Sequence, residues 1–197
     1  MKKILLFLFI TVSYTINAQK IDLKKNSTII PKVGLKNYPI DKTTLPEIIK
    51  AFGNDYEKSE DFVINENEQL PKLYELNYKK FGISFYILSN DNNQTIRAIK
   101  FTKPFNTLTE NKIKLGISTL GDVLKHTQNS SKISVSVKNK KEASAHINKF
   151  KLAETGISFS AKIANYDTNK YPSKKQLEAL VIDEIYISNY QHVLLIN

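Results

Sequence analysis

The sequence predicts an α+β fold made of two tandem repeats, each with two short helices packed on one face of an antiparallel β-sheet. The tetrapeptide Gly-Ile-Ser-Phe occurs twice, beginning at Gly82 and at Gly156. An amphipathic segment typical of a capped helix stands upstream of each copy and begins at Thr43 and at Ser118. The helical landmarks are 75 residues apart and the tetrapeptides 74 residues apart, so the flanking segments repeat together with the tetrapeptide.

The first 18 residues have the three parts of a secretion signal. Lys2 and Lys3 precede an apolar run from Ile4 to Val12, and a more polar stretch ends at Ala18. The apolar run is shorter than the roughly 20 residues that span a bilayer, and no later stretch is long enough. We therefore predict a Sec signal peptide at residues 1–18, and export to the periplasm or the cell exterior without a transmembrane segment.

The composition is typical of a globular protein. Of the 197 residues, 41% are hydrophobic and 24% are charged, which is enough for one sizeable core or two small ones. Because cysteine is absent, we expect no disulfide, no thiolate metal site and no lipid anchor on an N-terminal cysteine.

The chain is basic. Its formal charge of +10 falls to +8 without Lys2 and Lys3. An exported protein rarely meets nucleic acid, so we expect another protein or an anionic envelope component as the partner. The alternative is that the lysines are only solvated surface residues. The sequence leaves the oligomeric state open.

The first predicted helix follows Thr44. Apolar residues recur at the spacing of one helix face, at Leu45, Ile48, Ile49 and Phe52. Thr44 stands three residues before Glu47, as in a capping box, and Gly53 supplies a left-handed stop. Just upstream, Pro31 and Pro39 leave room for little helix.

The second copy repeats this pattern. Leu120, Val123 and Leu124 form the apolar face, and Thr119 stands three residues before Asp122. We expect the other helix of this copy at Leu108–Leu115.

Alternating strands follow each capped helix. Leu76–Ile87 aligns with Phe150–Ala161, and Ile96–Phe101 aligns with Ile182–Ile187. The second copy is longer because of a polar, proline-containing insertion at residues 165–176, which predicts an extended hairpin loop. We therefore divide the mature chain into repeat units at residues 19–106 and 107–197.

Alternation also predicts which side chains face the helices. The residues expected on the helix-covered face are Ile83, Phe85, Ile87, Ile99, Phe101, Ile157, Phe159, Ala161, Ile185 and Ile187. The residues expected on the opposite, concave face are Asn77, Ser84, Tyr86, Lys100, Lys151, Ser158, Ser160, Glu184 and Tyr186. Tyrosines suit recognition because they offer a large contact area with few rotatable bonds. The alternative is an open sheet face that is simply solvated.

The segment LTENKIKLGISTLGDVLK, from Leu108 to Lys125, resembles the signature of β-lactamase-inhibitor-protein-like domains. In that signature an isoleucine leads to a glycine, then to Ser or Thr, then to a helix carrying an Asp/Glu–Val pair. The matching residues here are Ile113, Gly116, Ser118, Thr119, Asp122 and Val123. Outer-membrane-assembly lipoproteins of the BamE type share this unit. The resemblance implies a tandem of two units, each with two helices on one sheet face.

The chain departs from this family at several points. Asp41 stands in the first copy where the second copy has Gly116. The lipidation cysteine of the BamE type and the disulfides of the inhibitor have no counterpart, since the chain has no cysteine. No segment aligns with the enzyme-plugging loop of the inhibitor, so the resemblance implies the fold and not β-lactamase inhibition.

Local signatures of catalysis are absent. His126, His146 and His192 lack a partner at metal-ligand spacing, and the chain has neither a G-x-S-x-G elbow nor a phosphate-binding glycine loop. We therefore predict a non-catalytic binding or adaptor protein without cofactor or metal, which uses its concave sheet face. The alternatives are an inhibitor or immunity-type factor against a secreted enzyme or toxin, a cell-envelope assembly or maintenance factor, and a hydrolase with a dispersed site.

Overall fold

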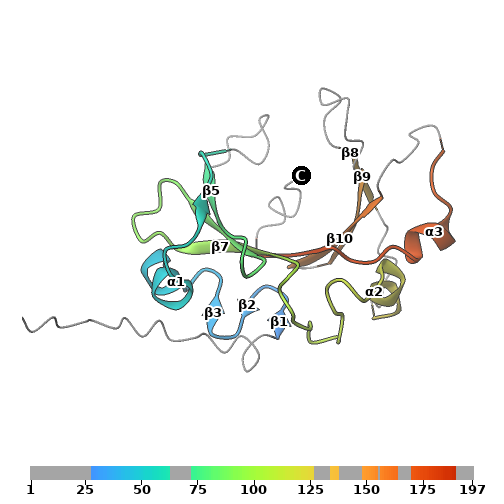
Figure 1. The fold of residues 1–197 in the computed structure, drawn as a ribbon, viewed down its shortest axis with the longest axis horizontal. Coiled ribbons are helices and arrows are strands. Elements are labelled where there is room, and N and C mark those ends of the chain that lie inside the picture. The colour runs from blue at the N-terminus through green and yellow to red at the C-terminus, as the bar shows by residue number, and fades with distance from the viewer. Residues whose placement is uncertain are drawn as a thin grey trace, which may run out of the picture.

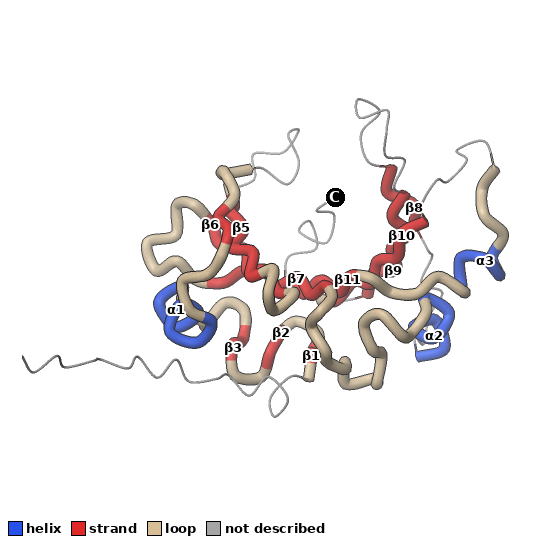
Figure 2. The backbone as a smooth tube through the Cα atoms, viewed as in Figure 1, coloured by secondary structure: helices blue, strands red, loops and turns tan. Residues whose placement is uncertain are grey.

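The computed structural model describes residues 28–62, 72–126, 134–137, 148–154, 156–163 and 170–189. The predicted signal peptide lies outside these residues. The described chain forms one curved eight-stranded antiparallel sheet, with helices and a small three-stranded sheet on its convex side (Figures 1 and 2). In this part of the chain no helix is long and apolar enough to cross a membrane.

The elements are short. The helices are α1 Leu45–Phe52, α2 Leu120–His126 and α3 Lys174–Glu178. The small sheet consists of β1 Ile29–Ile30, β2 Gly34–Leu35 and β3 Tyr38–Pro39. The large sheet consists of β4 Glu57–Lys58, β5 Leu73–Tyr78, β6 Ile83–Leu88, β7 Ile96–Thr102, β8 Ser134–Val137, β9 Asn148–Glu154, β10 Ile157–Ile163 and β11 Glu184–Ser188.

The strand order of the large sheet is mirrored about its centre. The order is β4-β5-β6-β7-β11-β10-β9-β8, so the last strand of each half lies in the middle. There β7 pairs antiparallel with β11, and Phe101 faces Ile185. The two halves therefore share one undivided sheet.

The helix-covered face forms the main core, as the alternation predicted. All ten residues expected on this face belong to one buried cluster. The cluster also contains Ile48 and Phe52 of α1 and Leu120 and Val123 of α2. Burial of these apolar faces, rather than the propensity of such short segments, stabilises the helices.

Both predicted caps are present. The backbone N–H and Oγ1 of Thr44 donate to Glu47 Oε2 at 2.8 and 2.9 Å. The backbone N–H and Oγ1 of Thr119 donate to Asp122 Oδ2 at 2.9 and 3.1 Å. Gly53 follows α1 at φ 83°, where glycine is favoured.

The cap of α2 predicts an acid-sensitive contribution to stability. The backbone N–H of Thr119, with the Lys125 ammonium, lowers the pKa of Asp122 to about 2. This folded-state pKa lies below the unfolded value of about 3.9. The stabilisation is therefore complete at neutral pH and is lost as the pH falls from about 4 to about 2. We expect wild type and Asp122→Asn to differ in unfolding free energy at pH 7 and to converge toward pH 2. A difference independent of pH would contradict this.

The two halves make the same backbone hydrogen bonds before each helix. The N–H of Asp41 donates to the carbonyl of Ile96 at 2.7 Å, and the N–H of Gly116 donates to the carbonyl of Ile182 at 2.8 Å. Asp41 and Gly116 both have positive φ, 61° and 74°. Aspartate tolerates this left-handed conformation better than most residues, which explains why it stands where the second half has glycine.

The equivalence continues into the helices. The N–H of Leu45 donates to the carbonyl of Gln94 at 3.0 Å, and the N–H of Leu120 donates to the carbonyl of Leu180 at 2.9 Å. Each helix is thus joined at its first residue to the segment that precedes the last strand of its own half.

The helix predicted at Leu108–Leu115 is wrong. This segment folds into a tight turn in which Leu108 bridges Lys114 and Lys112 has φ 61°. The N–H of Ile29 donates to the carbonyl of Leu108 at 2.9 Å, and Ile29 also bridges Thr109. Ile29 of β1 therefore pairs with backbone groups of this segment that a helix would have used for its own hydrogen bonds.

The predicted arrangement of two helices per half is not what the described residues form. Residues 29–39 form β1, β2 and β3, in line with the little helix expected beside Pro31 and Pro39. The insertion at 165–176, predicted as a loop, includes the start of α3. Ser173 caps this helix by accepting a hydrogen bond from the Gln176 N–H at 3.4 Å.

Candidate binding face

The strand register places the predicted binding residues on one face. Facing residues of paired strands point to the same side of a sheet. Lys100 faces Ser84 on β6 and Tyr186 on β11. Asn77 faces Ser84 from β5, and Ser158 faces Tyr186 from β10. These five residues form a row across the middle of the concave face.

The remaining predicted residues lie in neighbouring rows. Ser160 faces both Glu184 and Lys151, one row away. Tyr86 lies in the row on the other side, opposite Ala98. The backbone register thus brings all nine predicted residues together on the face opposite the helices.

Most of these side chains are buried. The exposed fraction is 1% for Tyr86 and 5% for Tyr186, and Ser84, Ser158, Ser160 and Glu184 are buried as well. Asn77 and Lys100 keep partial exposure. The structure does not describe the side chain of Lys151. This face is therefore not an open, solvated sheet surface.

Aromatic rings form the floor of the face. The rings of Tyr86 and Tyr186 meet edge to face with centroids 5.6 Å apart. Phe62 packs on Tyr86 with an interplanar angle of 88° at 6.2 Å, and Ala98 completes this small cluster. Sequence analysis missed Phe62, which reaches the face because its backbone pairs with Leu73 at the start of β5.

A charged pair lies beside the rings. Lys100 Nζ is 2.6 Å from Glu75 Oε1, and the two side chains are 22% and 21% exposed. The same Nζ lies 5.4 Å from the centroid of the Tyr86 ring. Glu75 was also missed, although it stands two residues before Asn77 on the same strand and the period-two rule would have placed it on this face.

Burial and hydrogen bonding oppose each other at Glu75. Burial raises the pKa of this carboxyl, but the hydrogen bond and charge of Lys100 and hydrogen bonds from Ser84 and Tyr86 outweigh it and leave the pKa below its ordinary value. Burial also raises the pKa of Tyr86 and of Tyr186 well above the ordinary value, and the charge of Glu75 adds to both shifts. Both tyrosines are therefore neutral hydroxyl donors.

The two tyrosines differ in hydrogen bonding. Tyr86 is bonded to Glu75, whereas the buried Tyr186 hydroxyl has no hydrogen-bond partner among the described residues. An unpaired buried hydroxyl costs about 1–3 kcal/mol. We expect Tyr186→Phe to raise the unfolding free energy by about 1 kcal/mol and Tyr86→Phe to lower it by about 1 kcal/mol. Urea denaturation measures both, and destabilisation by both variants would contradict this assignment.

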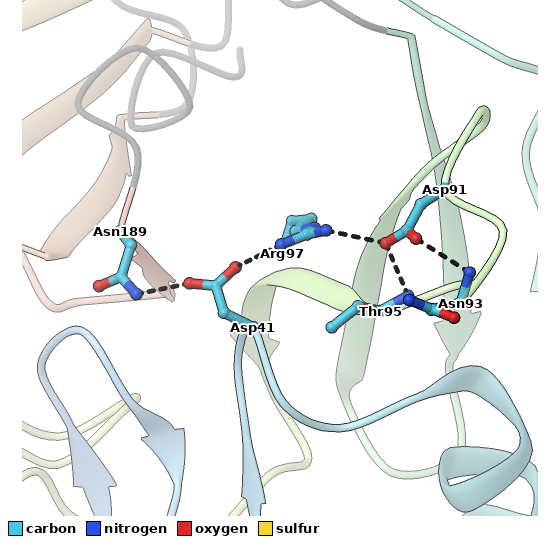
Figure 3. Close-up of polar contacts among 6 residues, drawn as sticks. All are labelled: Asp41, Asp91, Asn93, Thr95, Arg97 and Asn189. Carbon is cyan, nitrogen blue, oxygen red and sulfur yellow. Dashed lines mark hydrogen bonds and ion pairs between the residues drawn. The ribbon is translucent and has the colours of Figure 1, made fainter.

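A second polar network joins the two halves where β7 begins and β11 ends (Figure 3). Arg97 bonds Asp41 Oδ1 at 3.1 Å and Asp91 Oδ2 at 2.8 Å. Asp91 also accepts the backbone N–H of Thr95 at 3.1 Å, and Asn189 donates to Asp41. Arg97 stands at the β-bulge where the register of β6 and β7 shifts, and a bulge turns a side chain away from the regular alternation.

The described residues contain no cluster of metal-ligating side chains. No three His, Cys, Asp or Glu side chains gather there in a way that could hold a metal ion. His126 is the last residue of α2. His146 and His192 lie outside the described residues. Burial raises the pKa of Glu154, and the electrostatic interaction with His126 only partly offsets this rise.

Comparison with protein-family models, curated proteins and solved structures gave no significant match.

Proposed function

We propose that this chain is an exported, non-catalytic binding protein that contacts its partner through the concave face of the eight-stranded sheet. The observation that supports this most is the half-buried Lys100–Glu75 pair beside the ring of Tyr86. Such a pair gives little net stability, because desolvating two charges costs about as much as pairing regains. Fixed charges next to aromatic rings suit recognition of a polar partner surface.

Tyr186 supports the same proposal. Its ring packs against that of Tyr86, and within the described part of the chain its hydroxyl has no partner. An unsatisfied group that lowers stability is more common at functional sites than elsewhere. The proposed site consists of the nine predicted residues together with Glu75 and Phe62. The partly exposed Glu75, Asn77 and Lys100 would contact the partner, and the buried residues would hold them in place.

We also infer that the two halves descend from one duplicated unit. The matching hydrogen bonds of Asp41 and Gly116, the matching caps and the mirrored strand order support this. On this interpretation the binding face is composite, because its centre is built from the last strand of each unit.

A photo-crosslinking experiment tests the proposed face. A photoreactive residue at Asn77 would lie in the central row, and the same residue at Lys50, exposed on α1, would lie on the opposite side of the sheet. We expect an adduct in the native envelope fraction from position 77 and not from position 50, and we expect Lys100→Gln to abolish it. Equal adducts from both positions, or an adduct unaffected by Lys100→Gln, would exclude the concave face.

A further inference from the structure

Three apolar side chains are exposed on the convex side, in the loops around α2. Ile117 is 64% exposed, Val181 47% and Leu108 44%. We name these three residues the convex patch. They belong to the loops that lie below the large sheet and beside α2 in Figure 1.

Backbone pairing brings the three residues together. Thr119 bridges Val181, the N–H of Gly116 donates to the carbonyl of Ile182 at 2.8 Å, and the N–H of Ile182 donates to the carbonyl of Ser118 at 2.9 Å, so the chain segments that carry Ile117 and Val181 lie side by side. The N–H of Ile117 donates to the carbonyl of Lys114 at 3.2 Å, and Lys114 in turn bridges Leu108. The convex patch therefore comes from two neighbouring loops, one between β7 and α2 and the other between α3 and β11.

The scaffold does not require apolar residues at these positions. The bridge between Thr44 and Thr95 in the first half is the equivalent of the bridge between Thr119 and Val181. The first half therefore carries Thr95 where the second has Val181, and Lys42 where the second has Ile117. The same frame folds with polar side chains there, so the apolar pair is not explained by folding.

Three lysines lie in the loop that carries Leu108 and Ile117. Lys112 and Lys114 lie on the turn between Leu108 and Ile117, and the side chain of Lys103 lies against Gly116. Glu110 lies within this turn and Asp183 lies two residues after Val181, so the three lysines leave residues 103–119 and 179–183 with a net charge of +1. Exposed apolar side chains with lysines nearby complement a surface whose outer layer is anionic and whose interior is apolar.

We infer that the convex patch docks the protein on an anionic lipid surface. Three side chains are too few for a protein interface, which typically buries roughly 800 Å² on each partner. They suffice at a bilayer surface, where each inserted apolar group and each lysine near anionic headgroups adds to binding. Docking through the convex side leaves the concave face free for its partner, so this inference stands without the proposed function.

Vesicle sedimentation tests the inference. The protein is residues 19–197, which contain every described element and lack the apolar N-terminal run. The probes are vesicles of phosphatidylcholine alone and of phosphatidylcholine mixed with phosphatidylglycerol. We expect binding to the mixed vesicles at low salt, weak binding to the neutral ones, and loss of binding at high salt. Absence of binding to the mixed vesicles at low salt overturns the inference.

Two variants locate the contact. Ile117→Gln with Val181→Thr removes the apolar tips without changing the charge. Replacing Lys103, Lys112 and Lys114 by glutamine removes three positive charges from the loop that carries Leu108 and Ile117. We expect each variant to weaken binding by about tenfold or more.

A matched control removes the same charge elsewhere. Replacing the exposed Lys42, Lys50 and Lys72 by glutamine should weaken binding much less. An equal loss in this control overturns the assignment to the convex patch. Binding to polyglutamate as strong as to the vesicles, and unaffected by the Ile117→Gln and Val181→Thr pair, also overturns it, because charge alone would then account for the contact.

Discussion

Replacing Gly82 by alanine is expected to lower the unfolding free energy by about 3 kcal/mol or more. Gly82 has φ 67°, and a Cβ there would lie 2.3 Å from the carbonyl oxygen of Thr102 and 2.7 Å from the nitrogen of Pro104. These are backbone atoms, and the N–H of Thr102 donates to the Gly82 carbonyl at 2.8 Å, so the neighbouring chain cannot give way without losing that bond. Chemical denaturation of wild type and variant measures the difference.

Gly53 provides the control for this prediction. Its φ of 83° is equally unusual for other residues, but a Cβ there would meet nothing within 4 Å. Gly53→Ala should therefore cost about 1–3 kcal/mol from the backbone conformation alone (φ 83°, ψ −173°), and less than Gly82→Ala. Equal costs at Gly53 and Gly82 would show that the close packing of Gly82 against Thr102 is wrong.

Truncating Phe85 to alanine should destabilise the protein by about 3–5 kcal/mol. The side chain is fully buried at the centre of β6. Its ring packs edge to face against Phe52 of α1 at 5.2 Å and against Tyr78 of β5 at 5.9 Å. Truncation would leave a cavity between the first helix and the sheet that neither neighbouring ring could fill.

The matched variant is Phe85→Leu. Leucine keeps most of the apolar volume, so the expected loss is about 1 kcal/mol. Thermal or urea unfolding distinguishes the two variants. A cost below about 1 kcal/mol for Phe85→Ala would place this residue outside the core and would contradict the predicted inner face.

Features that depend on local chemistry were predictable from the sequence. The caps at Thr44 and Thr119 use contacts within one turn of chain, and the stop at Gly53 needs only a permissive backbone. The inner face of the sheet follows from period-two alternation, which holds wherever a strand is half-buried. These elements agree because local and tertiary preferences coincide there.

Features that depend on distant chain segments were not predictable. Leu108–Leu115 has helical spacing, but β1 lies beside it and takes its backbone groups into bridges. The helix at Lys174–Glu178 was missed even though Ser173 and Gln176 carry a capping-box pattern, because the surrounding polar insertion reads as a loop.

In the candidate site some features were predictable from the sequence and others were not. Alternation placed Tyr86, Lys100 and Tyr186 on one face, and the register agrees. The two tyrosines are buried together with Ala98, and Phe62 packs against this cluster from another segment of the chain. Lys100 on β7 pairs with Glu75 on β5, with β6 between them. This contact depends on the register of the strands, which cannot be read from a single sequence.

The central claim is that the two halves meet between β7 and β11 in one undivided sheet, so that the concave face is continuous. Backbone NOEs in solution test this most directly, because facing residues of an antiparallel pair bring either their amide or their α protons close together. We predict such NOEs between Ile99 and Ile187 and between Lys100 and Tyr186, together with slow amide exchange along β7. NOEs from β7 to β6 alone, with rapid exchange on its other edge, would show two separate sheets and contradict the account.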